Sequence, residues 1–184
     1  MKKLQTQLAT AILIVVLTSC LIDNSAIAQT NYLTYHNARF GFSIQYPSTF
    51  RLSEPPANGD GISFLPLDRS GDFRAFSSFN ALDRSGPQLF QEAANEITQS
   101  GGVVTYAVRL PNGFVVSGVI GNRVRYERVL FADDRGHLLN SSNVLPTDTH
   151  LDTFWAEYPV SRKEEFDGVV SVMSRSLNAG RGIY

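Results

Sequence analysis

The stretch VVTYAVRLPNGFVVSGVIGNRVRYERVLF, residues 103–131, contains three strand-like runs separated by two short turns. The turns are Pro111-Asn112-Gly113 and Gly121-Asn122, which are typical of tight connections between antiparallel strands. The middle run, residues 114–120, is apolar at nearly every position and predicts a strand that is covered on both faces. The whole stretch therefore predicts an antiparallel meander. In its first run, the alternation places four apolar side chains on one predicted face: Val104, Tyr106, Val108 and Leu110.

Further strands and two helices are predicted on either side of this meander. One helix should begin at Ser85, which forms a capping-box pattern with Gln88. The last helix should begin at Ser161, which forms the same pattern with Glu164, and it carries one apolar stripe that ends at Leu177. Helices of this kind dock on a sheet, so the predicted fold class is α+β, a central antiparallel β-sheet flanked by helices. The other strands are predicted over residues 40–46, 62–65, 73–79 and 154–158, with a weaker signal at 138–145.

The N-terminal segment has the pattern of an export signal. Lys2 and Lys3 precede an apolar run over Leu8–Leu17, which is too short for a typical membrane span. The expected organisation is a signal peptide over residues 1–28, a tether over 29–34, a single α/β domain over 35–178 and a tail over 179–184.

Two alternative cleavage positions follow from this segment. Leu17-Thr18-Ser19-Cys20 fits a bacterial lipobox, in which the chain is cut before Cys20 and the Cys20 thiol receives a lipid. Ala26-Ile27-Ala28 instead fits an A-x-A site with cleavage after residue 28. The chain has no second cysteine, so Cys20 cannot form an intramolecular disulfide, which favours the lipid. Both alternatives place the protein outside the cytoplasmic membrane, in a periplasm, a thylakoid lumen or on the outer face of a membrane.

The charge balance restricts the classes of partner. The chain has 16 basic and 17 acidic residues, which gives a formal net charge of −1 at pH 7. A nucleic-acid partner is not expected, because such proteins carry a strongly basic surface.

Four segments together resemble a group of exported bacterial proteins of unknown function. Through that group the chain resembles the Mog1/PsbP-like α/β/α sandwich, and distantly PsbP, the extrinsic protein of photosystem II. The resemblance implies a central antiparallel sheet flanked by helices, and it brings no catalytic residues. The four segments are RFGFSIQYPSTF (39–50), PPANGDGISF (55–64), GFVVSGVIGNRVRYERV (113–129) and YPVSRKEEFDGVVSVMSRSL (158–177).

No catalytic or cofactor motif is recognised in the sequence. A G-x-S-x-G elbow, a phosphate-binding loop and a dinucleotide fingerprint are all missing, so no catalytic residue and no cofactor is predicted. The three histidines, at positions 36, 137 and 150, lack metal-ligand spacing and are expected in loops or on the surface, so no metal ligands are predicted. Asn58 and Asp60 lie in a glycine-rich loop that could hold a cation weakly, although a simple turn is the stronger interpretation.

Arg123, Arg125 and Glu127 form a charged row on one face of the last meander strand. Such a row is either a solvated, internally paired strand face or a platform that contacts a partner. We therefore expect an exported, non-catalytic binding or accessory domain that contacts a membrane-associated protein or complex, with PsbP-like behaviour as one version. Membrane attachment would come from a lipid on Cys20. The alternatives are a small-ligand-binding protein, a hydrolase with an unrecognised site and an envelope structural protein.

Overall fold

The computed structural model describes residues 30–141 and 144–182. Within these ranges the chain forms nine strands, two α-helices and one 3₁₀ turn, η1 (Val160–Arg162). The helices are α1 (Gly86–Gln99) and α2 (Lys163–Ser176). The strands are β1 (Tyr32–His36), β2 (Ser43–Pro47), β3 (Arg51–Leu52), β4 (Gly61–Leu65), β5 (Asp72–Phe79), β6 (Val103–Leu110), β7 (Gly113–Ile120), β8 (Arg123–Ala132) and β9 (His150–Pro159).

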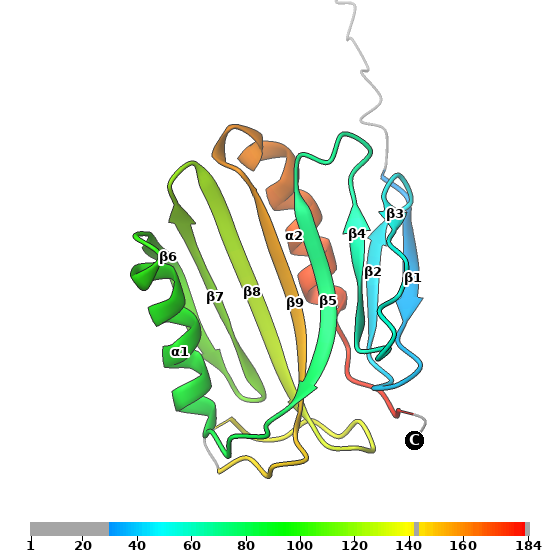
Figure 1. Ribbon diagram of the computed structural model, residues 1–184, viewed down its shortest axis with the longest axis vertical. Helices are drawn as coiled ribbons and strands as arrows, with labels where there is room; N and C mark the ends of the chain where they lie inside the picture. The colour runs from blue at the N-terminus through cyan, green and yellow to red at the C-terminus, as the bar shows by residue number, and fades with distance from the viewer. Residues whose placement is uncertain (1–29, 142–143, 183–184) are drawn as a thin grey trace, which may run out of the picture.

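Seven of these strands form one antiparallel sheet in the order β3-β4-β5-β9-β8-β7-β6 (Figure 1). The meander β6-β7-β8 forms as predicted, because each hairpin pairs neighbouring runs of the sequence. Strand β9 then pairs with β8 along ten residues, from Arg123 opposite Pro159 to Ala132 opposite His150. Its other edge pairs with β5, so the last strand of the chain joins the two halves of the sheet.

The sheet carries a separate hydrophobic core on each face. Val129 and Phe131 of β8 belong to the core that contains the apolar stripe of α1. Val124 and Leu130 belong to the core that contains Phe166 and the rest of the α2 stripe. Because neighbouring side chains of a strand point to opposite faces, the two helices lie on opposite sides of the sheet. The α+β architecture predicted from the sequence is confirmed.

Each face of the sheet is covered only in part. Helix α1 packs on β6 and β7, and it leaves the same face of β5 and of the later half of β9 open, whereas Leu151 near the start of β9 is buried in the α1 core (Figure 1). On the other face, α2 and the hairpin β1-β2 cover β8, β9, β5 and β4, whereas β6 and β7 extend beyond them. The prediction that residues 114–120 are covered on both faces is therefore only half correct. Phe114 and Val116 pack under α1, and the opposite side of β7 lines a groove.

The start of α1 agrees with the sequence, but the start of α2 does not. Ser85 and Gln88 form the predicted capping box, in which the Ser85 amide donates to Gln88 Oε1 at 2.8 Å. The box predicted from Ser161 is absent, because η1 delays α2 until Lys163. The Arg162 side chain holds this start instead, through ion pairs with Glu165 at 2.6 Å and Asp68 at 2.7 Å.

Several predicted boundaries shift where tertiary contacts decide them. The strand predicted over 40–46 begins at Ser43, because residues 37–42 form a turn in which Asn37 Oδ1 accepts a hydrogen bond from the Phe40 amide at 2.8 Å. The segment 138–145 makes one bridge, between Leu138 and Ala132, rather than a strand over its described residues. Strand β9 begins at His150, four residues before the prediction.

The described parts of both predicted flanking segments also enter the fold. The tether predicted over 29–34 overlaps β1, because Tyr32–Thr34 pairs with β2. The tail predicted over 179–184 begins inside the core, where Ala179 is buried, and Asn178 just before it bridges Ser43. The domain seen in residues 30–182 is therefore longer at both ends than the predicted 35–178.

Glycine at position 118 lets α1 approach the sheet closely. A Cβ atom there would lie 2.5 Å from the Val103 carbonyl oxygen and 2.8 Å from Ile97 Cγ2. Gly118→Ala should therefore lower the free energy of unfolding by about 1–3 kcal/mol, which urea titration would measure.

Gly168→Ala is the matched control, because a Cβ atom at this position of α2 meets nothing within 4 Å. Removing a flexible glycine from a helix interior should raise the free energy of unfolding by about 0.5–1 kcal/mol. Equal effects of the two substitutions would contradict close packing at Gly118.

Candidate functional site

A tryptophan flanked by arginines marks the part of the sheet that α1 leaves open. Trp155 of β9 lies opposite Arg74 of β5 in the strand register. The guanidinium carbons of Arg74 and Arg125 lie 5.1 Å and 5.6 Å from the centroid of the Trp155 ring. Both distances allow a cation–π interaction, so the ring is held between two cations while remaining partly exposed. We call the surface formed by Arg74, Arg123, Arg125, Trp155 and Glu157 the arginine–tryptophan face.

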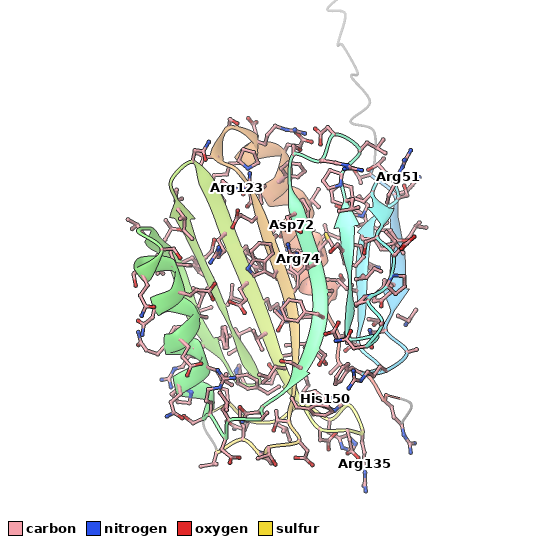
Figure 2. The ribbon with its side chains drawn as sticks, viewed as in Figure 1. Arg51, Asp72, Arg74, Arg123, Arg135 and His150 are labelled. Carbon is pink, nitrogen blue, oxygen red and sulfur yellow. The ribbon has the colours of Figure 1, made fainter. Side chains whose placement is uncertain are left out.

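The charges on this face are paired with one another. Glu157 accepts from Arg123 at 2.6 Å and from Arg125 at 3.1 Å, and Arg125 also pairs with Glu96 of α1 at 2.9 Å. Arg74 forms an ion pair with Asp72 on its own strand; Figure 2 shows this pair and Arg123 near the same end of the sheet. The face therefore presents both signs of charge around an aromatic centre.

Of the predicted row, Arg123 and Arg125 take part in this network and Glu127 lies beside it. All three side chains point to the α1 face of β8. Burial, with a further contribution from Glu96, raises the pKa of Glu127 to about 7, and the neighbouring Arg125 offsets this only in part. Glu127 lines a small cavity of about 200 Å³ between α1 and β5. Contact of this row with a partner stays a prediction.

The loop that contains Asn58 and Asp60 is organised by internal hydrogen bonds. Nδ2 of the Asn58 side chain donates to Asp60 Oδ2 at 2.7 Å, and Arg39 donates to the backbone carbonyl of Asn58 at 2.6 Å. Protein donors therefore already occupy two of the oxygens that a cation would use. A weak cation site at this loop stays a prediction.

The three histidines lie apart in the fold. His36 ends β1 and is exposed, and His137 is exposed in a turn, where its Nδ1 lies 2.9 Å from Asp133 Oδ2. His150 is buried at the start of β9, where its ring contacts those of Phe40 and Phe79, which also contact each other; this corrects the predicted loop position. Among residues 30–141 and 144–182, no group of three or more His, Cys, Asp or Glu side chains could hold a metal ion.

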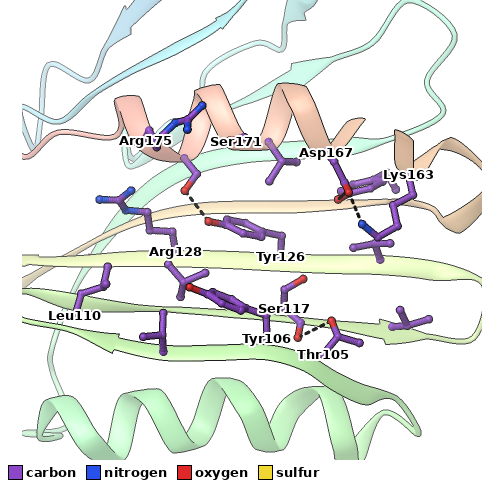
Figure 3. A pocket seen from close by; sticks show the side chains of 17 residues that line it. Thr105, Tyr106, Leu110, Ser117, Tyr126, Arg128, Lys163, Asp167, Ser171 and Arg175 are labelled. Carbon is purple, nitrogen blue, oxygen red and sulfur yellow. Dashed lines mark hydrogen bonds and ion pairs between the residues drawn. The ribbon is translucent and has the colours of Figure 1, made fainter. Parts of the chain in front are cut away.

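A second surface is a groove beside α2, on the opposite face of the sheet. It has a volume of about 530 Å³ and lies over the parts of β6 and β7 that α2 does not cover (Figure 3). A register shift near Thr105 sends Val104 to the α1 core, while Tyr106 faces the groove, which corrects the uniform alternation predicted for this strand. We call this surface the helix groove; its apolar lining is Tyr106, Val108, Leu110, Val115, Val119, Val124, Tyr126, Tyr158 and Val170.

The two ends of the helix groove differ in charge. At one end Lys163 forms an ion pair with Asp167, which also accepts from the Tyr158 hydroxyl at 2.8 Å. Arg128 and Arg175 both line the other end (Figure 3). The sequence did not reveal this groove, and the only signal for it was the apolar surface on both sides of residues 114–120.

Two solved structures resemble this fold along most of its length. The solution structure of cyanobacterial PsbP (CyanoP) from Synechocystis sp. PCC 6803 covers 86% of this chain and 98% of its own, at 13% identity and a TM-score of 0.55. The crystal structure of LpqN, involved in cell envelope biogenesis of Mycobacterium tuberculosis, covers 83% and 92%, at 11% identity and a TM-score of 0.53. The fold is PsbP-like. No protein-family model and no curated protein matches the sequence.

Within this PsbP-like fold, an acidic side chain lies buried in the core on the α2 side. Asp152 of β9 is fully buried, and neither carboxyl oxygen has a hydrogen-bond partner of good geometry among the described residues. Burial raises the pKa of Asp152 to about 7, and the hydroxyl of Ser77, opposite on β5, opposes this shift only in part. The folded state therefore holds a proton on Asp152 at pH values where the unfolded chain has already lost it.

This carboxyl should make stability fall as the pH rises. The pKa of Asp152 is near 3.8 in the unfolded chain and about 7 in the folded protein. The loss of free energy of unfolding therefore begins above pH 3.8 and grows until the pH passes about 7. Asp152→Asn removes the titration. Urea titrations at pH 5 and pH 8 would give the difference in free energy of unfolding between the variant and the natural protein. This difference should favour the variant by about 2 kcal/mol more at pH 8 than at pH 5. A difference that does not change with pH would show that Asp152 does not hold this proton.

Proposed function

We propose that this protein is an exported, non-catalytic accessory domain that binds a protein of a membrane-associated complex through the arginine–tryptophan face. The observation that carries the proposal is Trp155, which lies partly exposed between Arg74 and Arg125 on an open sheet face. Tryptophan and arginine, with tyrosine, are the residue types enriched where a few side chains supply most of the binding energy of an interface.

The charges of this face define the chemistry of the partner. Every arginine in it already has a carboxylate neighbour, so the face is not a simple basic patch for a polyanion. A partner surface of mixed charge with an apolar centre would fit around Trp155, because complementary ion pairs set orientation while the ring supplies buried area.

Export is part of the same proposal. The apolar run Leu8–Leu17 and the two alternative cleavage sites lie outside the residues that the structure describes, as does Cys20. Within the described ranges, neither α1 nor α2 is long and apolar enough to cross a bilayer. The likeness in fold to a cyanobacterial PsbP protein and to a protein of cell envelope biogenesis supports a location in a periplasm, a lumen or on the outer face of a membrane.

The intact mass of the protein purified from membranes would test the attachment. We expect a chain that begins at Cys20 and carries the added mass of a diacylglyceryl group, because Cys20 is the one cysteine of the sequence and cannot form an intramolecular disulfide. An unmodified chain that begins at Gln29 would contradict a lipid anchor but leave export intact. A chain that retains residues 1–19 would contradict export by cleavage.

Affinity capture from detergent-solubilised membranes would test the binding face. Trp155→Ala should reduce the recovery of a specific partner at least about tenfold, as expected for truncation of a central interface residue. Tyr106→Ala is the matched control, because it truncates an exposed aromatic residue on the opposite face of the sheet.

Arg74→Gln is a second variant for the same capture experiment, and it leaves the core intact because this side chain is exposed. It should weaken recovery of the same partner by a smaller factor, because it removes one cation beside the ring. Equal recovery with Trp155→Ala and with the natural protein, or the absence of any reproducible partner, would contradict the proposal.

A further inference from the structure

The helix groove has the shape of a site for an elongated apolar ligand. Its volume of about 530 Å³ lies within the range of roughly 300–1,000 Å³ that is usual for small-molecule sites. It runs along α2 from Lys163 to Arg175, a length of about 18 Å at the rise of an α-helix. Valine and leucine side chains from three strands form its floor, and Val170 adds to the wall on the α2 side. Such a lining favours a hydrocarbon chain over a compact polar molecule.

The arginine end of the groove carries positive charge without a partner. No ion pair or hydrogen bond joins the side chain of Arg128 or Arg175 to any other described residue, and Arg128 Nε is buried. The Arg128 side chain is partly buried, and this burial lowers its pKa because part of the charge is removed from water. A partly desolvated guanidinium is stabilised when an anion reaches it, and its fork of donors matches a carboxylate well.

The other end of the groove does not compete for an anion. Lys163 is paired with Asp167, and Tyr158 donates to the same carboxylate, so the local charge is already balanced. The groove therefore has a direction. An anionic group would bind at Arg128 and Arg175, and an apolar chain would extend from there along α2 toward Lys163 (Figure 3).

We propose that the helix groove is a binding site for a single-chain amphiphile with a carboxylate head group, such as a long-chain fatty acid. Arg128 and Arg175 bind the head group, and the valine-lined floor of β7 holds the chain. This site lies on the opposite face of the sheet from the arginine–tryptophan face, so it stands or falls independently of the proposed protein contact. The concave, apolar shape favours a single chain over a membrane surface, which would need a flat or protruding basic patch.

Isothermal titration calorimetry with ligands of equal chain length, below their micelle concentrations, would test the site. Dodecanoate should bind saturably with one site per protein chain. It should bind at least about tenfold more tightly than dodecyltrimethylammonium, because the arginines attract an anionic head group and repel a cationic one. Dodecyl phosphate tests whether the site prefers a phosphate head group to a carboxylate. If dodecyl phosphate binds more tightly than dodecanoate, the assignment of a carboxylate ligand is overturned. Equal affinity for the anionic and cationic chains, or no saturable binding of dodecanoate, would overturn the proposal.

Variants locate the binding in the groove. The double variant Arg128→Gln/Arg175→Gln should bind dodecanoate about tenfold more weakly or worse, with no loss of affinity for the cationic chain. Arg109→Gln is the matched control, because Arg109 is exposed on β6 and points to the opposite face. Unchanged dodecanoate affinity in the double variant, with the fold verified by circular dichroism, would place the ligand elsewhere and overturn the proposal.

Discussion

The pairing of β8 with β9 is the interaction on which the rest of the structure depends. Along its ten residues it fixes which side chains of the sheet face α1 and which face α2. Val129 and Phe131 enter one core, while Val124 and Leu130 enter the other. A shift of one residue in this register would exchange the two sets and expose both cores at once, so the pairing is strongly specified by hydrophobic burial.

The two candidate surfaces follow from the widths of helices and sheets. An α-helix with its side chains is about 10–12 Å across, and neighbouring strands lie about 4.8 Å apart, so one helix covers two or three strands. Helix α1 lies over one edge of the sheet, while α2 and the β1-β2 hairpin lie over the opposite face toward the other edge. The uncovered areas are therefore diagonally opposed: one is the arginine–tryptophan face and the other contains the helix groove.

Arginine has different roles on these two surfaces. Arg123 and Arg125 lie beside Glu157, so their charges are compensated inside the protein and their planes are held in place. Arg128, three residues along the same strand from Arg125, points to the other face, where no described carboxylate meets it. Because side chains alternate between the two faces of a strand, the arginines that are paired inside the protein lie on one face, and Arg128, which an external anion would pair, lies on the other.

Local patterns in the sequence determined the type and order of most elements. The Asn-Gly and Gly-Asn turns specify the meander, the capping box at Ser85 specifies the start of α1, and the apolar stripes require helices on a sheet. These signals depend on neighbouring residues alone, which is why the α+β fold could be predicted. The lipobox at Cys20 and the predicted export signal likewise rest on sequence patterns alone, and they lie outside the described residues.

Only the tertiary structure decided what each face meets. The insertion of β9 between β5 and β8 brings Trp155 between Arg74 and Arg125, which lie far apart in the sequence. It also buries Asp152, which no sequence pattern marks as a core residue. The same long-range pairing leaves one side of β7 uncovered and so creates the groove. A sequence pattern shows that a face is apolar or charged, but whether that face is buried, paired or open depends on which distant segment lies against it.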